Sequence, residues 1–306
     1  MSSFCTLDEL VQAAQQKGPV KIAVAAGHDA DVIEALKQAR KLKLAEGILV
    51  GDRERITALA GEINFDLIAD QVINEPDPAQ AAAQAVGLVR QGKADLLMKG
   101  KVSTSVLIRA VLNKEAGLRT GKLLSQVIVF QVPGFDRLMI MSDAAINIAP
   151  TLAQKAGICR NTIEVAHAIG IEKPNVAALC ALEFVNPDMP ATLDAAGLTM
   201  MNRRGEIKGA YVEGPIAMDV PLSRFAADRK GIETPLAANT DIFLAPDIEA
   251  ANILYRAIIY FAKGESGGIV VGAKAPLILL SRAETPETKI RSIAIGVLLG
   301  KAQRNP

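Results

Sequence analysis

Five polar loops follow apolar segments of this sequence, and each carries residue types that bind phosphate or move protons. A flexible glycine, hydroxyl groups and cations at the start of a helix suit a phosphate group. The first loop fits this description, with Lys99, Thr104 and, one to two turns into the following helix, Arg109. An ordinary strand-to-helix turn with solvated lysines remains open as an alternative. The five loops are MKGKVST (98–104), GLRTG (117–121), SDAAIN (142–147), EGPIAMD (213–219) and LSRAE (280–284).

The second and third loops add polar groups of two kinds. Arg119 offers a guanidinium group, although a solvated surface turn is an equal alternative for its loop. Asp143 and Asn147 follow another apolar segment, where Ser142 or Asp143 could instead cap a helix.

The last two loops contain the carboxylates that could act as a base. Asp219 follows a Gly-Pro turn, which brings it near the end of one strand. Ser281 and Arg282 offer a hydroxyl and a guanidinium group for phosphate, and Glu287 follows them. The alternative for this segment is a helix cap around Thr285 with solvent-exposed acids.

Several signatures are missing from the sequence. There is no G-x-x-x-x-G-K-[ST], no G-x-G-x-x-G after the first strand and no G-x-S-x-G, which disfavours P-loop kinases, standard dinucleotide folds and serine hydrolases. His28 and His167 are far apart in the sequence, which disfavours a histidine-based zinc site or a catalytic triad and favours a packing or turn role for His28. We therefore expect no metal.

Short apolar runs alternate with helical stretches, which predicts an α/β fold with mostly parallel sheets. Asp29 is an expected helix cap, Asp77-Pro78 places a proline in the first turn of a helix, and Ser103 and Thr104 after Gly100 provide another expected cap. The predicted strands lie at 21–26, 47–50, 94–98, 127–132, 138–141, 176–182, 210–212, 242–244, 269–271 and 277–280, and the helices at 29–44, 78–91, 103–112, 150–169, 221–230, 248–262 and 287–299.

Composition narrows the classes of partner and compartment. The 306 residues predict two domains at about 150 residues each. The net charge of +1 and 4% aromatic residues disfavour nucleic acid and anionic membranes as partners. No apolar run is long enough to span a membrane, and the N-terminus does not resemble a signal peptide. Three cysteines without a CxxC motif fit a reducing cytoplasm.

Taken together, these loops resemble the phosphate acetyl/butyryl transferase family over roughly residues 20 to 300. Each segment alone is weak, but their order and spacing are specific. The segments are ADLLMKG (94–100), GLRT (117–120), DAAINIAP (143–150), VNPDMPATLDAA (185–196), RGEIKG (204–209), EGPIAMD (213–219), PDIEA (246–250), VGAKAP (271–276) and LSRA (280–283).

The resemblance implies two α/β domains flanking a cleft, similar to isocitrate and isopropylmalate dehydrogenases. The first would comprise residues 1–124 and 267–306, and the second, inserted domain residues 125–266. Family members are commonly dimers, so a homodimer is expected.

The resemblance also implies a reaction: reversible transfer of a short acyl group, butyryl or acetyl, between coenzyme A and inorganic phosphate. Acyl-CoA and acyl phosphate would be substrates in a ternary complex, with no acyl-enzyme and no permanently bound cofactor. By position, Arg282 would contact phosphate and Ser281 the reacting thiol or carbonyl. Thr104 and Arg109 match a phosphate-side or CoA-side pair, and Asp143, Asn147 and Asp219 match polar positions that line the cleft.

Two positions depart from the family pattern. Acetyl-specific relatives place an Asp soon after the Ser-Arg pair, whereas Glu287 is the nearest carboxylate here, so Glu287 and Asp219 both remain candidate bases. Gln126 stands where a His is expected in butyryl-type relatives, which leaves the acyl length open. Two other readings remain: a metal- and NAD-dependent hydroxyacid dehydrogenase of similar architecture, and a non-enzymatic two-lobed binding protein.

Overall fold

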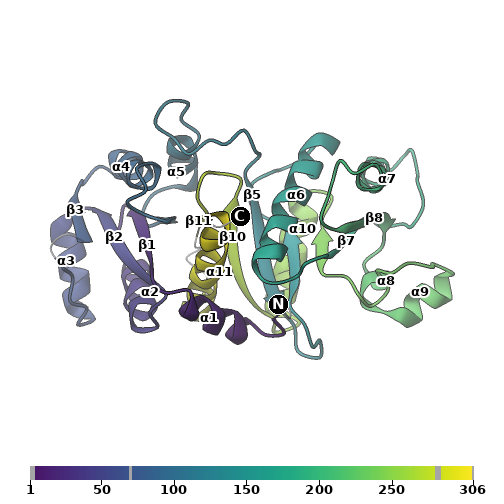
Figure 1. Cartoon of the computed structure of the whole chain (residues 1–306), viewed down its shortest axis with the longest axis horizontal. Coiled ribbons are helices and arrows are strands. Elements are labelled where there is room, and N and C mark those ends of the chain that lie inside the picture. The colour runs from purple at the N-terminus through teal and green to yellow at the C-terminus, as the bar shows by residue number, and fades with distance from the viewer. Residues whose placement is uncertain (1–3, 69–70, 280–283, 305–306) are drawn as a thin grey trace. The chain divides into compact units, whose positions relative to one another are not determined.

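The computed structural model describes residues 4–68, 71–279 and 284–304. The chain divides into two compact units. The terminal unit comprises residues 8–122 and 267–306, and the middle unit comprises residues 123–266 together with residues 1–7. Each unit combines helices with a sheet, so the mixed α/β class predicted from the sequence is confirmed (Figure 1).

The terminal unit is built on strands in the order β3-β2-β1-β4-β11-β10. Neighbouring strands are parallel from β3 to β11, and only β10 runs antiparallel to β11. All but one residue of β1 are buried, as expected for a strand covered on both faces. The strands are β1 (Val20–Ala25), β2 (Ala45–Gly51), β3 (Val72–Asn74), β4 (Leu96–Lys99), β10 (Glu265–Val271) and β11 (Leu277–Ile278).

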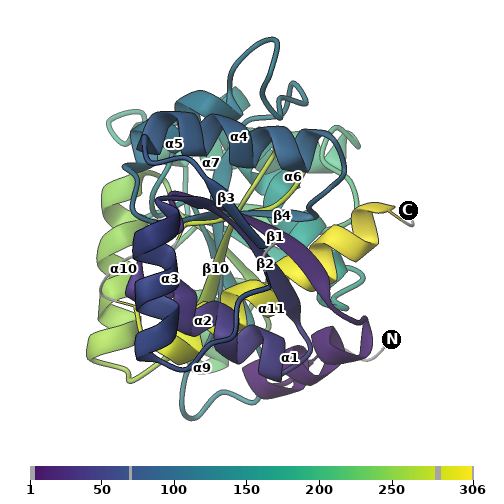
Figure 2. The ribbon, with the colours of Figure 1, turned by 90° about the vertical axis from the view of Figure 1, so that its left-hand side faces the viewer.

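Helices cover both faces of this sheet (Figures 1 and 2). On one face α4 (Pro78–Arg90) packs against α5 (Thr104–Val111), and on the other α2 (Ala30–Lys41) packs against α3 (Arg53–Glu62) and α11 (Pro286–Arg304). The helix α1 (Leu7–Gln16) precedes β1. A chain that moves outward from β1 through β2 to β3 and then returns to β4 must place its crossover helices on opposite faces, because such crossovers are right-handed.

The three helix starts predicted for this unit are confirmed, and the structure assigns Asp77 and Ser103 as the caps of the second and third. The Asp29 carboxylate accepts the Val32 amide hydrogen at the start of α2. Asp77, which precedes Pro78, accepts the amide hydrogens of Ala79 and Gln80 at the start of α4, and Ser103 caps α5. Each cap satisfies a backbone N–H that has no partner within its helix, which fixes where the helix begins.

The middle unit has strands in the order β5-β6-β9-β7-β8. The β5–β6 pair is antiparallel, and the remaining neighbours are parallel. The strands are β5 (Ser125–Gln131), β6 (Met139–Ser142), β7 (Asn175–Leu179), β8 (Tyr211–Ile216) and β9 (Ile242–Leu244). The helices are α6 (Leu152–Ala168), α7 (Pro190–Arg203), α8 (Asp219–Leu222), α9 (Arg224–Lys230) and α10 (Ile248–Tyr260).

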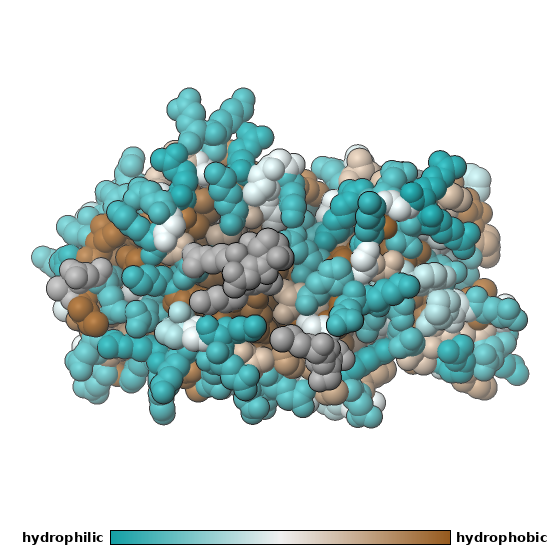
Figure 3. All heavy atoms as spheres, viewed as in Figure 1, coloured by the Kyte–Doolittle hydropathy of each residue, from teal (hydrophilic) through white to brown (hydrophobic). Residues whose placement is uncertain are grey.

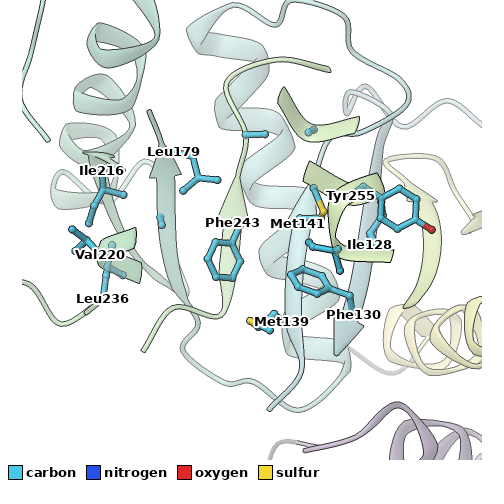
Figure 4. Close-up of a cluster of buried hydrophobic side chains, with 14 of the residues drawn as sticks. Ile128, Phe130, Met139, Met141, Leu179, Ile216, Val220, Leu236, Phe243 and Tyr255 are labelled. Carbon is cyan, nitrogen blue, oxygen red and sulfur yellow. The ribbon is translucent and has the colours of Figure 1, made fainter. Parts of the chain in front are cut away.

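One face of this sheet carries an apolar cluster that includes Phe130, Met141 and Phe243 (Figure 4). The Phe130 and Phe243 rings lie with their centroids 6.3 Å apart, and Tyr255 of α10 belongs to the same cluster. Since side chains alternate between faces along a strand, Val129 is buried on the opposite face. Burial of both faces explains why β5 reads as a continuous apolar run.

Four elements were not predicted from the sequence: α1, α3, α7 and β3. The single helix predicted at 221–230 is two short helices, α8 and α9, which are separated at Ser223. Helix α3 buries only Ile56 and Ala60 among its described residues, so it carries no apolar stripe. Strand β3 is three residues long, too short for a periodic signal. The prediction for β8 was also too short, since this strand continues to Ile216 and Glu213 lies inside it rather than in the following loop.

Candidate active site

In the terminal unit, the loops that follow β1 and β4 meet at the carboxyl ends of these two strands. The Gly100 and Lys101 amides donate to the carbonyl oxygens of Ala25 and Ala26, at 2.9 and 2.8 Å. A Cβ atom on Gly100 would collide with both carbonyls, so only glycine allows this approach. The strand order reverses between β1 and β4, and ligands of open α/β sheets bind at such a reversal.

Three of the predicted substrate-binding residues, Lys99, Thr104 and Arg109, lie at the end of β4 and on the following helix α5. The Lys99 side chain is half-buried, and its Nζ donates to the carbonyl oxygens of Gly100 (3.3 Å) and Val102 (3.5 Å). Thr104 and Arg109 are exposed on α5. Because five residues separate them, their side chains leave the helix in directions about 140° apart. The two therefore do not form a single tight pocket on one helix face.

The fourth, Arg119, is exposed in the loop between α5 and β5. This loop is fastened to the segment after β10: Arg119 forms an isolated bridge with Ala273, and the Thr120 hydroxyl donates to the Gly272 carbonyl at 2.5 Å. The loop projects from the ribbon in Figure 1, and hydrophilic side chains cover it in the same view (Figure 3). Its backbone is thus held in place while its cation stays accessible.

The segment before α11 contains the predicted phosphate-binding pair, and Ser281 and Arg282 lie outside the described residues. Glu287 is exposed in the first turn of α11. Its own backbone N–H, the Thr285 hydroxyl and the charge of Arg291 lower the pKa of the Glu287 carboxyl. The lowered pKa favours the ionised form, so Glu287 accepts protons less readily than an ordinary carboxylate.

In the middle unit, Asp143 is buried and its carboxylate is fully engaged within its own loop. It accepts the amide hydrogens of Ala145, Ile146 and Asn147, and the Asn147 Nδ2 group at 2.6 Å. Asn147 Nδ2 also donates to the Leu124 carbonyl. No helix begins at this point, because α6 starts later behind the Thr151 cap. Asp143 and Asn147 therefore shape this loop from inside.

Asp219, the other candidate base, lies at the start of α8, after the carboxyl end of β8. Lys230 donates to both the Asp219 and the Glu183 carboxylates, at 2.8 and 2.7 Å. The hydrogen bond from Lys230 is the main reason that the pKa of Asp219 is lowered. Sequence reasoning missed Lys230 and Glu183, because their partners come from segments far apart along the chain.

The described residues contain neither a metal-binding cluster nor a membrane-spanning helix. Within residues 4–68, 71–279 and 284–304, no set of three or more His, Cys, Asp or Glu side chains is arranged to hold a metal ion. Over the same ranges, no helix has the length and apolar character needed to cross a bilayer.

Comparison with known proteins identifies the family. Residues 77–297 match the family model described as "Phosphate acetyl/butaryl transferase". This match covers more than half of the chain, so the protein belongs to the phosphate acetyl/butyryl transferase family.

Individual members of the family are similar to this chain over almost their full length. The chain is 47% identical over 294 residues to the phosphate butyryltransferase of Clostridium acetobutylicum, covering 96% of this chain and 98% of the relative. It is 44% identical over 292 residues to the phosphate acetyltransferase of Thermotoga maritima, with 95% and 99% covered. A crystal structure of a branched-chain phosphotransacylase from Enterococcus faecalis V583 superimposes with a TM-score of 0.80 at 29% identity, with 92% and 99% covered.

Proposed function

We propose that this protein catalyses the reversible transfer of a short acyl group between coenzyme A and inorganic phosphate. The observation that carries this proposal is the similarity to phosphate butyryltransferase over nearly both full chains. The cationic loops at the carboxyl end of β4 support it, because both substrates are anionic.

The acyl group passes directly from one substrate to the other. In the CoA-acylating direction, the CoA thiolate forms a bond to the carbonyl carbon of the acyl phosphate, the carbon–oxygen bond to phosphate breaks, and phosphate leaves. Burial raises the pKa of Cys159 to about 12 and that of Cys180 to about 11. These two thiols are therefore poor nucleophiles near neutral pH, in keeping with the ternary complex without an acyl-enzyme that we propose.

Cations hold the phosphate and offset the charge that develops on it. In this proposal Arg282 contacts phosphate, and Ser281 hydrogen-bonds to the reacting thiol or carbonyl. Lys99, Arg109 and Arg119 add positive charge in the same unit. Preorganised charge of this kind stabilises the transition state, and alignment of the two reactants supplies much of the remaining acceleration.

Asp219 and Glu287 remain the two candidate bases for the thiol proton. Both have a lowered pKa, so either would be ionised throughout the neutral range. The pH–rate profiles of Asp219→Asn and Glu287→Gln decide between them. Loss of the base reduces kcat by about 10²- to 10⁴-fold, and wild-type profiles in both variants would reject both residues.

The finer proposals follow from the family resemblance and the composition. We propose that the protein acts as a homodimer in the cytoplasm. Its three cysteines without a CxxC motif suit that reducing compartment. The two units would correspond to the two domains expected at 1–124 with 267–306 and at 125–266. Both butyryl and acetyl groups remain candidate acyl groups.

A thiol-release assay tests the function. Acetyl-, propionyl- and butyryl-CoA are supplied with and without phosphate, and acyl phosphate is trapped with hydroxylamine. Phosphate-dependent thiol release together with hydroxamate supports the proposal, and the rates across the series give the acyl preference. Thiol release without any need for phosphate, or NAD reduction without thiol release, refutes it.

A further inference from the structure

His28 combines deep burial with a ring nitrogen that has no partner. It lies between the end of β1 and Asp29, the N-cap of α2, and is 7% exposed. Its Nδ1 atom is enclosed and has no hydrogen-bond partner. The ring lies against the end of β2, because a Cβ atom on Gly51 would be 3.0 Å from Nδ1. A buried polar atom without a partner is uncommon and calls for an explanation.

The surroundings of the ring favour one protonation state. Burial is the largest cause that lowers the pKa of His28; the charges of Arg55 and Lys101 lower it further, and those of Asp52 and Asp29 oppose them. The imidazole is therefore neutral near neutral pH. A buried N–H without an acceptor is rarer in proteins than a buried acceptor without a donor, so the single hydrogen belongs on Nε2. Only Nδ1 is both enclosed and without a partner, so Nε2–H is the donor that remains open to a ligand.

The nearby carboxylates are already engaged. Asp52 accepts the Arg55 backbone amide hydrogen at 3.1 Å and its Nε at 3.2 Å. Asp29 accepts the Val32 amide hydrogen as the cap of α2. Both carboxylates therefore have partners of their own, and the charge of Lys101 also acts on His28.

The position suits an anionic ligand for three independent reasons. The β1 and β4 loops meet here, where the strand order of the sheet reverses. The twelve-residue helix α2 begins two residues after His28, behind its cap Asp29, and directs its N-terminal amides toward this edge of the sheet. The ring N–H then adds a donor at a place where the charges of Arg55 and Lys101 act together with those of Asp52 and Asp29, whose carboxylates already accept hydrogen bonds from the protein.

We propose that His28 is a substrate-binding residue whose Nε2–H donates a hydrogen bond to a phosphoryl oxygen, with Lys101 and the N-terminus of α2 sharing the negative charge. This inference rests on the proposed function for the identity of the ligand. The phosphoryl group belongs either to coenzyme A or to inorganic phosphate, since both present the same oxygens. The enclosed Nδ1 lone pair cannot reach a substrate proton, so His28 binds rather than acts as the base.

Nuclear magnetic resonance tests this directly, because the chain contains only two histidines. The protein is labelled with ¹⁵N-histidine and titrated separately with coenzyme A, 3′-dephospho-coenzyme A, pantetheine and inorganic phosphate. His167 is the internal control: its Nε2 lies 2.9 Å from the Gly209 carbonyl in the middle unit. The variant His167→Gln assigns the two sets of signals.

We expect the unbound protein to show His28 as the Nε2–H tautomer. Coenzyme A or phosphate should then shift the His28 signals and leave those of His167 in place, and pantetheine should shift neither. A response to phosphate alone assigns the phosphate subsite, and a response to coenzyme A that weakens with 3′-dephospho-coenzyme A assigns its 3′-phosphate. An Nδ1–H tautomer, or unchanged His28 signals while calorimetry shows that coenzyme A and phosphate are bound, would overturn the proposal.

Kinetics of two variants give a second readout. In His28→Gln a side-chain amide can replace the Nε2–H donor, whereas His28→Leu removes it. We expect His28→Leu to raise the KM of the assigned ligand by roughly ten- to a hundredfold, the range for a lost hydrogen bond to a charged group. His28→Gln should recover most of this loss, with kcat changed less than KM.

These results are separable from a failure of the proposed function. If thiol release never depends on phosphate but ligands still shift the His28 signals, the function fails and the binding site stands. A folded His28→Leu variant with wild-type KM for both substrates would reject the role of His28, whatever the reaction proves to be.

Discussion

The close contact at Gly100 makes a quantitative prediction for the substitution Gly100→Ala. The added methyl group would meet the carbonyl oxygens of Ala25 and Ala26, which are backbone atoms and cannot rotate away. The two loops must separate, and this movement weakens the hydrogen bonds from Gly100 and Lys101. Each bond contributes about 0.5–1.5 kcal/mol, and residual strain in packed backbone costs about 1–3 kcal/mol. We expect the free energy of unfolding to fall by roughly 2–4 kcal/mol, because the same movement relieves part of the clash.

The assay compares urea unfolding of this variant with that of Gly87→Ala. Gly87 lies inside α4, and the nearest atom to its added Cβ would be 4.0 Å away. Alanine there improves helix propensity and should stabilise the protein by about 0.5–1 kcal/mol. The same chemical change should thus have opposite signs at the two positions. Unchanged stability and acyl-transfer rate in Gly100→Ala would refute the reasoning about the β1–β4 contact.

Three further predictions concern single side chains. Lys155→Met leaves Asp194 without its partner at 2.7 Å, in a pair whose side chains are 9% and 27% exposed, so we expect the free energy of unfolding to fall by about 2–3 kcal/mol. Adding Asp194→Asn to this variant should restore part of the stability, and an equally large loss in the double variant would contradict this account. The lowered pKa of Asp219 means that its pair with Lys230 adds stability above the unfolded value of 3.8, which is lost as the pH falls through the folded pKa. Unfolding of Lys230→Met should therefore differ from wild type at neutral pH and converge with it in acid; a constant difference at every pH argues against the pair. Finally, Arg282→Ala should raise the KM for phosphate more than the KM for acyl-CoA, and equal values in the variant and the wild type would remove Arg282 from the phosphate site.

Buried strands and capped helices were predictable because their signals are local. Strand β1 is mostly apolar and is followed by a polar turn, in which Asp29 is a local signal for the start of the next helix. By contrast, α7 buries only Thr192, Ala195 and Leu198, so its amphipathic pattern is too weak to read. Its existence depends on packing against β8, which is a contact made by the fold and not by the helix itself.

The candidate site residues were chosen by residue type, and their partners in the folded protein could not be predicted. Asp143 was chosen for its carboxylate, and only the folded loop reveals that this carboxylate accepts hydrogen bonds from the next residues and Asn147. Asp219 likewise meets Lys230 across a helical segment. His28 looked like a packing residue in the sequence, because nothing local indicates that one of its nitrogens is enclosed without a partner.

The discontinuous terminal unit sets the order in which this protein can be completed during translation. One side of β4 can pair with β1 early, but its other side has no neighbour until β11 has been translated, since Leu97 pairs with Leu277 and the whole middle unit lies between the two strands in the chain. Residues 123–266 emerge well before that point and can already pack their own sheet. Until then, that edge of β4 presents amides and carbonyls without a strand partner, and such edges are prone to incorrect pairing while a chain is incomplete.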